Sequence, residues 1–82
     1  MTITAIIWSK TQCPQCDQAK ALLKLHDIVY EERIITDDGN WTREHLLEAV
    51  PTARAVPQIF IGDRHLGGFN ELRQYLQEAI WL

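Results

Sequence analysis

The sequence is poor in glycine, proline and cysteine, and it contains no long hydrophobic run. Four Gly and three Pro among 82 residues, with 46% hydrophobic side chains, are typical of a compact globular chain and exclude a collagen-like or low-complexity one. No apolar stretch reaches the roughly 20 residues that a membrane-spanning helix needs. A chain this short cannot bury two separate cores, so we expect a single domain over residues 1–82.

Positive charge is also scarce. Eight Lys and Arg residues against eleven Asp and Glu give a net charge of −3. Because a negative field repels the phosphates of nucleic acids and anionic lipids, we expect neither nucleic acid nor a membrane as a partner. Residues 1–9 contain no basic side chain and no apolar run of signal-peptide length, and two cysteines are too few for a disulfide-rich secreted scaffold. The expected location is the cytoplasm.

Hydrophobic spacing predicts an α/β fold with the element order β-α-β-α-β-β-α. The expected strands cover residues 2–8, 28–35, 58–61 and 64–66. The first helix is expected over residues 14–25, the second from a Thr42 cap until Pro51 stops it, and the third from an Asn70 cap to the end of the chain.

The same pattern predicts how the strands are arranged. The first strand is apolar on both faces, which is typical of a central strand, whereas the charges at 31–33 place the second strand at an exposed edge. A parallel crossover is expected between these two strands, and a hairpin at Gly62-Asp63 adds the other two on the opposite side. The result is a four-stranded mixed sheet with helices on both faces.

The two cysteines, Cys13 and Cys16, stand between an expected strand and an expected helix, which is the context of a redox-active pair. At a helix N-terminus, free backbone N–H groups and the helix dipole stabilise a thiolate and lower its pKa. Cys13 lies at that end, which we expect to be exposed. Cys16, about one turn further, can attack a mixed disulfide on Cys13. The sequence therefore predicts Cys13 as the nucleophile and Cys16 as the resolving thiol.

Two non-catalytic interpretations of the pair fit less well. A zinc site needs two further ligands, but His26, His45 and His65 are scattered and there is no second pair of cysteines, so no metal is expected. Inert buried cysteines would not require the intervening Pro14 or the polar turn that precedes the pair.

Three segments together resemble the glutaredoxin family, in that family's order and spacing. They are residues 8–16 (WSKTQCPQC), 54–62 (RAVPQIFIG) and 65–72 (HLGGFNEL). The resemblance covers nearly the whole chain and implies a thioredoxin-like fold, glutathione as reducing co-substrate, and reduction of protein disulfides and glutathione mixed disulfides. The chain is most similar to the short phage or bacterial type, whose relatives often donate electrons to ribonucleotide reductase. We expect a monomer.

The resemblance also implies a glutathione site. Pro57 matches the family's cis-proline, and the backbone of Val56 would pair with the cysteinyl unit of glutathione. Gly68 allows close approach of a ligand, and the free N–H groups that follow it can hold a carboxylate. Lys10 would attract the glycyl carboxylate and stabilise the Cys13 thiolate. The implied glutathione-binding residues are Lys10, Gln15, Val56, Pro57, Gly68, Phe69 and Asn70.

Several positions depart from the family's pattern or are ambiguous. Gln15 replaces a common tyrosine, which removes an aromatic wall, and Ala55 replaces the usual threonine. Asn70, expected with Phe69 at the γ-glutamyl end, stands where aspartate is common and lacks the charge to pair with an ammonium group. Arg54 either attracts the glycyl carboxylate or simply faces solvent.

Because of these departures, other functions stay open. The nearest is a thioredoxin-like dithiol reductant that is recycled by thioredoxin reductase. A glutathione-ligated iron–sulfur cluster carrier is also compatible with thiolate chemistry, although family members that do this usually lack the equivalent of Pro14. A redox-silent binding module is a third alternative.

Overall fold

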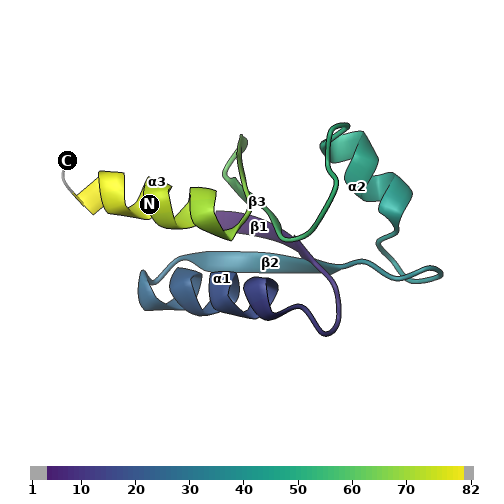
Figure 1. Cartoon of the computed structure of the whole chain (residues 1–82), viewed down its shortest axis with the longest axis horizontal. Coiled ribbons are helices and arrows are strands. Elements are labelled where there is room, and N and C mark those ends of the chain that lie inside the picture. Colours follow the sequence, from purple (N-terminus) through teal and green to yellow (C-terminus); the bar gives the residue numbers. More distant parts are fainter. Residues whose placement is uncertain (1–3, 81–82) are drawn as a thin grey trace.

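The structure is a computed structural model that describes residues 4–80. Its elements are β1 (Thr4–Ser9), α1 (Pro14–Leu25), β2 (Val29–Ile34), α2 (Arg43–Ala49), β3 (Gln58–Ile61), β4 (Arg64–Gly67) and α3 (Phe69–Ile80). This order is the predicted one (Figure 1). Within the described residues, no helix is both long and apolar enough to cross a membrane.

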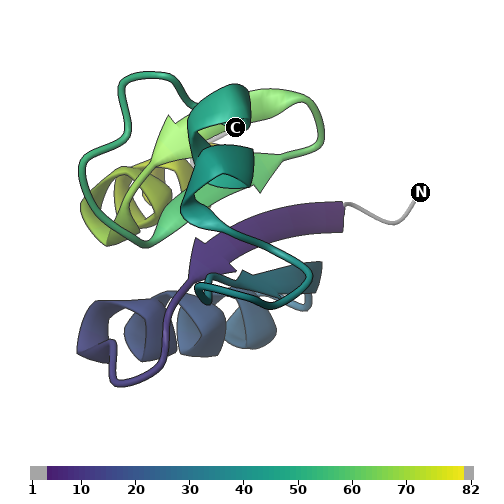
Figure 2. The same ribbon diagram turned by 90° about the vertical axis from the view of Figure 1, so that its right-hand side faces the viewer.

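The strands form one mixed sheet in the order β2-β1-β3-β4. β1 pairs in parallel with β2 and antiparallel with β3, and β4 pairs antiparallel with β3. The central position of β1, the edge position of β2 and the hairpin on the opposite side are all as predicted. Figure 2 shows α2 in front of the sheet and α1 and α3 behind it.

The single domain has an apolar cluster on each face of its sheet, and β1 contributes to both clusters because successive side chains of a strand point to opposite faces. Ala5 and Ile7, which are fully buried, pack with residues of α1 and α3. On the other face, Trp8 packs against Leu46 of α2 and against Val50, the residue that follows α2. The mostly apolar sequence of β1 is therefore explained by a strand that is covered on both sides.

Most element boundaries agree with the predictions, and the differences lie at element ends. The 14–25 helix and the 58–61 strand are confirmed, and α2 is capped at Thr42, whose N–H donates to Nδ1 of His45 at 3.0 Å. β1 ends at Ser9 rather than Trp8, and its predicted start at Thr2 lies outside the described residues. β2 is one residue shorter at each end than predicted.

The predicted Asn70 cap of the last helix is wrong. β4 continues through Gly67, which adopts a φ of +124° that side-chain-bearing residues rarely reach, and α3 then begins at Phe69. The N–H of Gly68 donates to Oε1 of Glu71 at 2.7 Å, so a glutamate inside the helix provides the cap. Leu72 and Leu76 of this helix are buried, and the side chains of Ala79 and Ile80 lie outside the described set.

Candidate redox site

The sheet topology brings the three sequence segments of interest to one end of the sheet. Trp8 of β1 pairs with Gln58 of β3, and the two strands are antiparallel, so the chain after β1 and the chain before β3 leave the sheet together. Ile59 of β3 pairs with Gly67 at the end of β4, so the turn into α3 leaves at the same end. The cysteines, the Val56-Pro57 segment and the β4–α3 turn therefore share this end.

Cys13 and Cys16 form a disulfide, with their Cα atoms 5.2 Å apart. Cys13 is the N-cap of α1, Pro14 occupies the first turn, and the backbone N–H of Cys16 donates to Sγ of Cys13 at 3.1 Å. This N–H is one of the groups left free at a helix start, and it points at the sulfur that the sequence predicts to be the nucleophile. The local geometry can thus stabilise negative charge on Cys13 after reduction.

The predicted exposure of Cys13 is wrong for this oxidised state. Cys13 is only 6% exposed and Cys16 only 1%. The preceding loop is exposed at Thr11 and Gln12, and Gln12 has a positive φ of 55°, which is uncommon for a residue with a side chain. The low exposure of the two cysteines depends on the tertiary packing around them, which residue types alone do not reveal.

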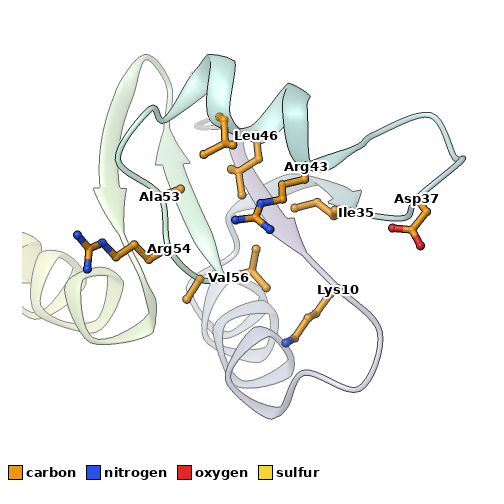
Figure 3. A pocket seen from close by; sticks show the side chains of 10 residues that line it. Lys10, Ile35, Asp37, Arg43, Leu46, Ala53, Arg54 and Val56 are labelled. Carbon is orange, nitrogen blue, oxygen red and sulfur yellow. The ribbon is translucent and has the colours of Figure 1, made fainter.

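A cleft of about 310 Å³ lies beside this end of the sheet. Lys10 and Val56, two of the predicted glutathione-binding residues, line it together with Arg54, and so does Arg43, the first residue of α2. Figure 3 shows the Arg54 side chain extending away from Lys10. Three cationic side chains and one anionic side chain, Asp37, line the cleft, so its charge is net positive although the whole chain carries a net charge of −3. Such a cleft favours an anionic ligand.

The other predicted binding residues lie around the β4–α3 turn and the start of α1. The bond between Val56 and Pro57 is cis, and Pro57 is buried. A methyl group placed on Gly68 would lie 3.6 Å from the Pro57 carbonyl oxygen, so the two segments are neighbours. Phe69 is half-buried and packs against the apolar cluster between the sheet and the helices α1 and α3. Gln15 and Asn70 are both exposed.

Within the part of the chain that the structure describes, no group of three or more His, Cys, Asp or Glu side chains could hold a metal ion.

The geometry agrees with the comparisons with known proteins. A model of the glutaredoxin family matches residues 5–66. This chain belongs to the glutaredoxin family. The "Glutaredoxin 1" of Rickettsia typhi is 36% identical over 76 residues, covering 93% of this chain and 73% of that protein.

Solved glutaredoxin structures have the same thioredoxin-like fold. Glutaredoxin 1 from Francisella tularensis, solved with cacodylate, is 28% identical, with a TM-score of 0.79, and the match covers 99% of this chain and all of that one (100%). A buckwheat glutaredoxin–glutathione complex is 26% identical, with a TM-score of 0.77, and the match covers 94% of this chain and 71% of that one. The present chain is thus a glutaredoxin-type thiol-disulfide oxidoreductase with Cys13 and Cys16 as its redox-active pair.

Two residues of this glutaredoxin site are missing from the sequence prediction. Arg43 lines the cleft, and its signal was weak because a basic residue directly after a helix cap is normally a solvated surface group. Glu71 binds the N–H of Gly68, and its signal was the spacing, since a glutamate three residues after a helix cap commonly returns to the cap's backbone.

A polar cluster beneath α1 joins the helix to the sheet of the glutaredoxin. Ser9 is fully buried, and its Oγ donates to Oε2 of Glu32 at 2.7 Å. Nζ of Lys20 donates to the same oxygen at 2.9 Å. Burial raises the pKa of Glu32, but the hydrogen bonds from Lys20 and Ser9 and the positive charges nearby outweigh burial, so the net pKa lies below its ordinary value. The hydrogen bond to Glu32 raises the pKa of Lys20.

Replacing this carboxylate should make the stability difference depend on pH. A lowered folded-state pKa stabilises the fold above the ordinary value of 4.5 and loses that contribution as the pH falls through the folded pKa. We expect Glu32→Gln to lower the free energy of unfolding by about 1 kcal/mol at pH 7 and the difference from the unmodified protein to shrink below pH 4.5. Urea unfolding between pH 7 and pH 3 measures this. Glu48→Gln, exposed on α2, is the control, and a difference that stays constant with pH would contradict the assignment.

Proposed function

We propose that this glutaredoxin takes its electrons from glutathione and that glutathione binds in the cleft lined by Lys10, Arg43 and Val56. The observation that carries the proposal is the position of this cationic cleft at the same end of the sheet as the cysteine pair. Glutathione carries two carboxylates and an extended peptide backbone, which suit positive side chains and an unpaired backbone segment. The buckwheat glutaredoxin of similar fold was solved in complex with glutathione.

The proposed reaction has two exchange steps. The Cys13 thiolate attacks the glutathionyl sulfur of a mixed disulfide, so that a Cys13–glutathione disulfide forms and the other thiol leaves as its thiolate. A second glutathione thiolate then attacks that glutathionyl sulfur, which releases oxidised glutathione and regenerates the Cys13 thiolate. With a protein disulfide, the Cys13 thiolate first forms a mixed disulfide with one protein sulfur and releases the other as a thiolate. Cys16 then attacks Cys13, which breaks the bond to the protein, releases its second thiolate and leaves the Cys13–Cys16 disulfide. Two electrons pass from thiol to disulfide in each case.

We assign the remaining contacts on the basis of the family resemblance and the positions described above. The backbone of Val56, ahead of Pro57, pairs with the cysteinyl unit, and Lys10 binds the glycyl carboxylate. Gln15 borders the sulfur on the first turn of α1. The γ-glutamyl end lies at Gly68, Phe69 and Asn70.

A coupled assay separates this proposal from its nearest competitor. The substrate is the mixed disulfide of glutathione and 2-mercaptoethanol, and NADPH oxidation is followed with either glutathione plus glutathione reductase or thioredoxin reductase alone. We expect turnover with the first system and little with the second. Turnover supported only by thioredoxin reductase would establish the thioredoxin-like alternative. Because no metal ligation is part of the mechanism, the activity is expected to survive a chelator.

The charge of Lys10 gives a second test. We expect Lys10→Met to raise the KM for the glutathione mixed disulfide about fivefold, because an exposed charge pair contributes up to about 1 kcal/mol. The effect should shrink in high salt, which screens exposed charges. Lys24→Met, exposed in the last turn of α1, is the control and should leave the KM unchanged. An equal change in both variants would mean that overall charge, rather than the Lys10 contact, sets the KM.

For a protein substrate, we propose ribonucleotide reductase, on the basis of the resemblance to the short phage and bacterial glutaredoxins. The test is reduction of the purified oxidised reductase by the reduced protein, followed by gel shift of alkylated thiols. Failure with this substrate would leave the small-disulfide activity untouched and would redirect the search to other disulfide-bearing proteins.

A further inference from the structure

A side-chain bridge fixes the segment just ahead of the cis-proline. Nε2 of Gln58 donates to the carbonyl oxygen of Ala55 at 2.9 Å, and Oε1 of Gln58 lies 2.8 Å from Nε2 of His65. The bridge therefore runs from β4, through the first residue of β3, to a backbone group directly before Val56.

The chemistry of the three groups fixes which atom donates. The Ala55 carbonyl can only accept, so the amide NH₂ of Gln58 faces it and the amide oxygen faces His65. His65 must then carry a proton on Nε2, which both the matching neutral tautomer and the imidazolium do. The His65 ring is itself placed by Phe60, its partner across the β3–β4 pair, with ring centroids 5.0 Å apart.

The bridge matters because the segment it holds has little regular structure of its own. Residues 51–57 belong to neither a helix nor a strand among the described elements. On one side Val56 lines the cationic cleft, and on the other the Pro57 carbonyl lies against Gly68. Gln58 is an anchored support, since its backbone pairs with Trp8 in the centre of the sheet. The hydrogen bond from this anchored side chain to the Ala55 carbonyl therefore limits the rotation of the Ala55–Val56 peptide group.

We propose that Gln58 and His65 are positioning residues that set the orientation of the Val56 backbone groups and so determine how tightly the substrate's cysteinyl backbone is bound. The inference rests on the proposed function in that Val56 is taken as the backbone that pairs with substrate. Neither side chain reacts. Their effect is to hold the pairing groups in place before the substrate arrives, which lowers the entropy that binding must remove.

Two matched variants dissect the bridge. Gln58→Met has a similar length and removes both hydrogen bonds, while His65→Phe removes the donor but keeps a ring against Phe60. His65→Gln restores a donor. Gln74→Met is the control, because Gln74 is exposed on α3 and its amide contacts only Glu78 of the same helix among the described hydrogen bonds.

Three measurements are made on each full-length variant after its unfolding midpoint has been recorded. They are the KM and kcat with the mixed disulfide of glutathione and 2-mercaptoethanol, the rate at which iodoacetamide alkylates Cys13, and the ¹⁵N order parameter of the Val56 amide. Alkylation needs no backbone pairing, so it reports the thiol alone. We expect Gln58→Met to raise the KM about fivefold, which corresponds to the net contribution of one hydrogen bond to binding. The kcat and the alkylation rate should stay unchanged, and the order parameter of the Val56 amide should fall. His65→Phe should raise KM about twofold, and His65→Gln and Gln74→Met should behave like the unmodified protein.

The outcomes distinguish this inference from the proposed function. An unchanged Val56 order parameter in Gln58→Met overturns the inference, whatever the substrate. A lower order parameter with an unchanged KM, or an alkylation rate that falls together with turnover, also overturns it. If the unmodified protein fails to use the glutathione mixed disulfide, the proposed function fails, and the order parameters still decide whether the bridge holds Val56.

Discussion

Replacing Cys13 with serine is expected to abolish disulfide reduction, whereas replacing Cys16 with serine is expected to leave reduction of a glutathione mixed disulfide largely intact. A serine hydroxyl cannot form a mixed disulfide, and the N–H of Cys16 that points at Sγ of Cys13 then has no thiolate to stabilise. The loss in Cys13→Ser should exceed about a thousandfold. In Cys16→Ser, a second glutathione resolves the mixed disulfide on Cys13, so only the reduction of protein disulfides by the dithiol route is lost.

The two activities are measured in parallel on both variants. NADPH oxidation coupled to glutathione reductase follows the glutathione mixed disulfide, and insulin precipitation follows a protein disulfide. Equal loss of both activities in both variants would contradict the glutathione route and favour an obligate dithiol mechanism. Residual activity of Cys13→Ser that is lost only after Cys16 is also replaced would reverse the assignment of nucleophile and resolving thiol.

Truncating Leu23 is expected to cost about 3–4 kcal/mol of unfolding free energy. Leu23 is fully buried in the core behind the sheet, where α1 meets β1 and α3, and a smaller side chain leaves a cavity as well as losing buried apolar surface. A domain of 82 residues has a total stability of roughly 5–10 kcal/mol, so Leu23→Ala removes a large part of it.

The same helix supplies the matched control for this prediction. Leu25 lies two residues further on and is 77% exposed, so Leu25→Ala makes the same chemical change and should alter stability by less than about 0.5 kcal/mol. Urea unfolding followed by circular dichroism measures both variants. Equal effects of the two truncations would mean that the packing of α1 on the sheet differs from the one described.

The elements that the sequence predicts well are those in which local pattern and tertiary packing agree. Residues 14–25 begin with Pro14 and repeat apolar side chains at helical spacing, and the helix has these limits. The 58–61 strand and its Gly62-Asp63 turn are equally local, and Gly62 adopts a positive φ of 58°. The family resemblance predicted the cis bond before Pro57, and the bond is cis.

What the sequence does not reveal depends on groups that are distant in the chain or on competition between neighbours. Asn70 is a good capping residue, but the Glu71 carboxylate caps the N–H of Gly68 and Gly67 adopts a positive φ, so the helix begins two residues earlier than an Asn70 cap would allow. The burial of Cys13 depends on how the surrounding segments pack in three dimensions, which the local sequence does not encode. Arg43 lines the cleft because the fold brings the start of α2 close to Val56, in the segment that precedes β3. No local sequence pattern encodes this relation.

Since the reacting groups gather where β1 ends and β3 begins, the opposite end of the sheet carries none of the site residues named above within the described part of the chain. There the Gly62-Asp63 turn closes the hairpin, the Gly62 N–H donates to the Thr4 carbonyl oxygen at 3.0 Å, and a Cβ added at Gly62 would meet nothing within 4 Å. Foreign sequence grafted into this turn would project into open space at the far pole from the sulfurs. The molecule thus offers an attachment point for a label or tether that leaves the cysteine pair unobstructed.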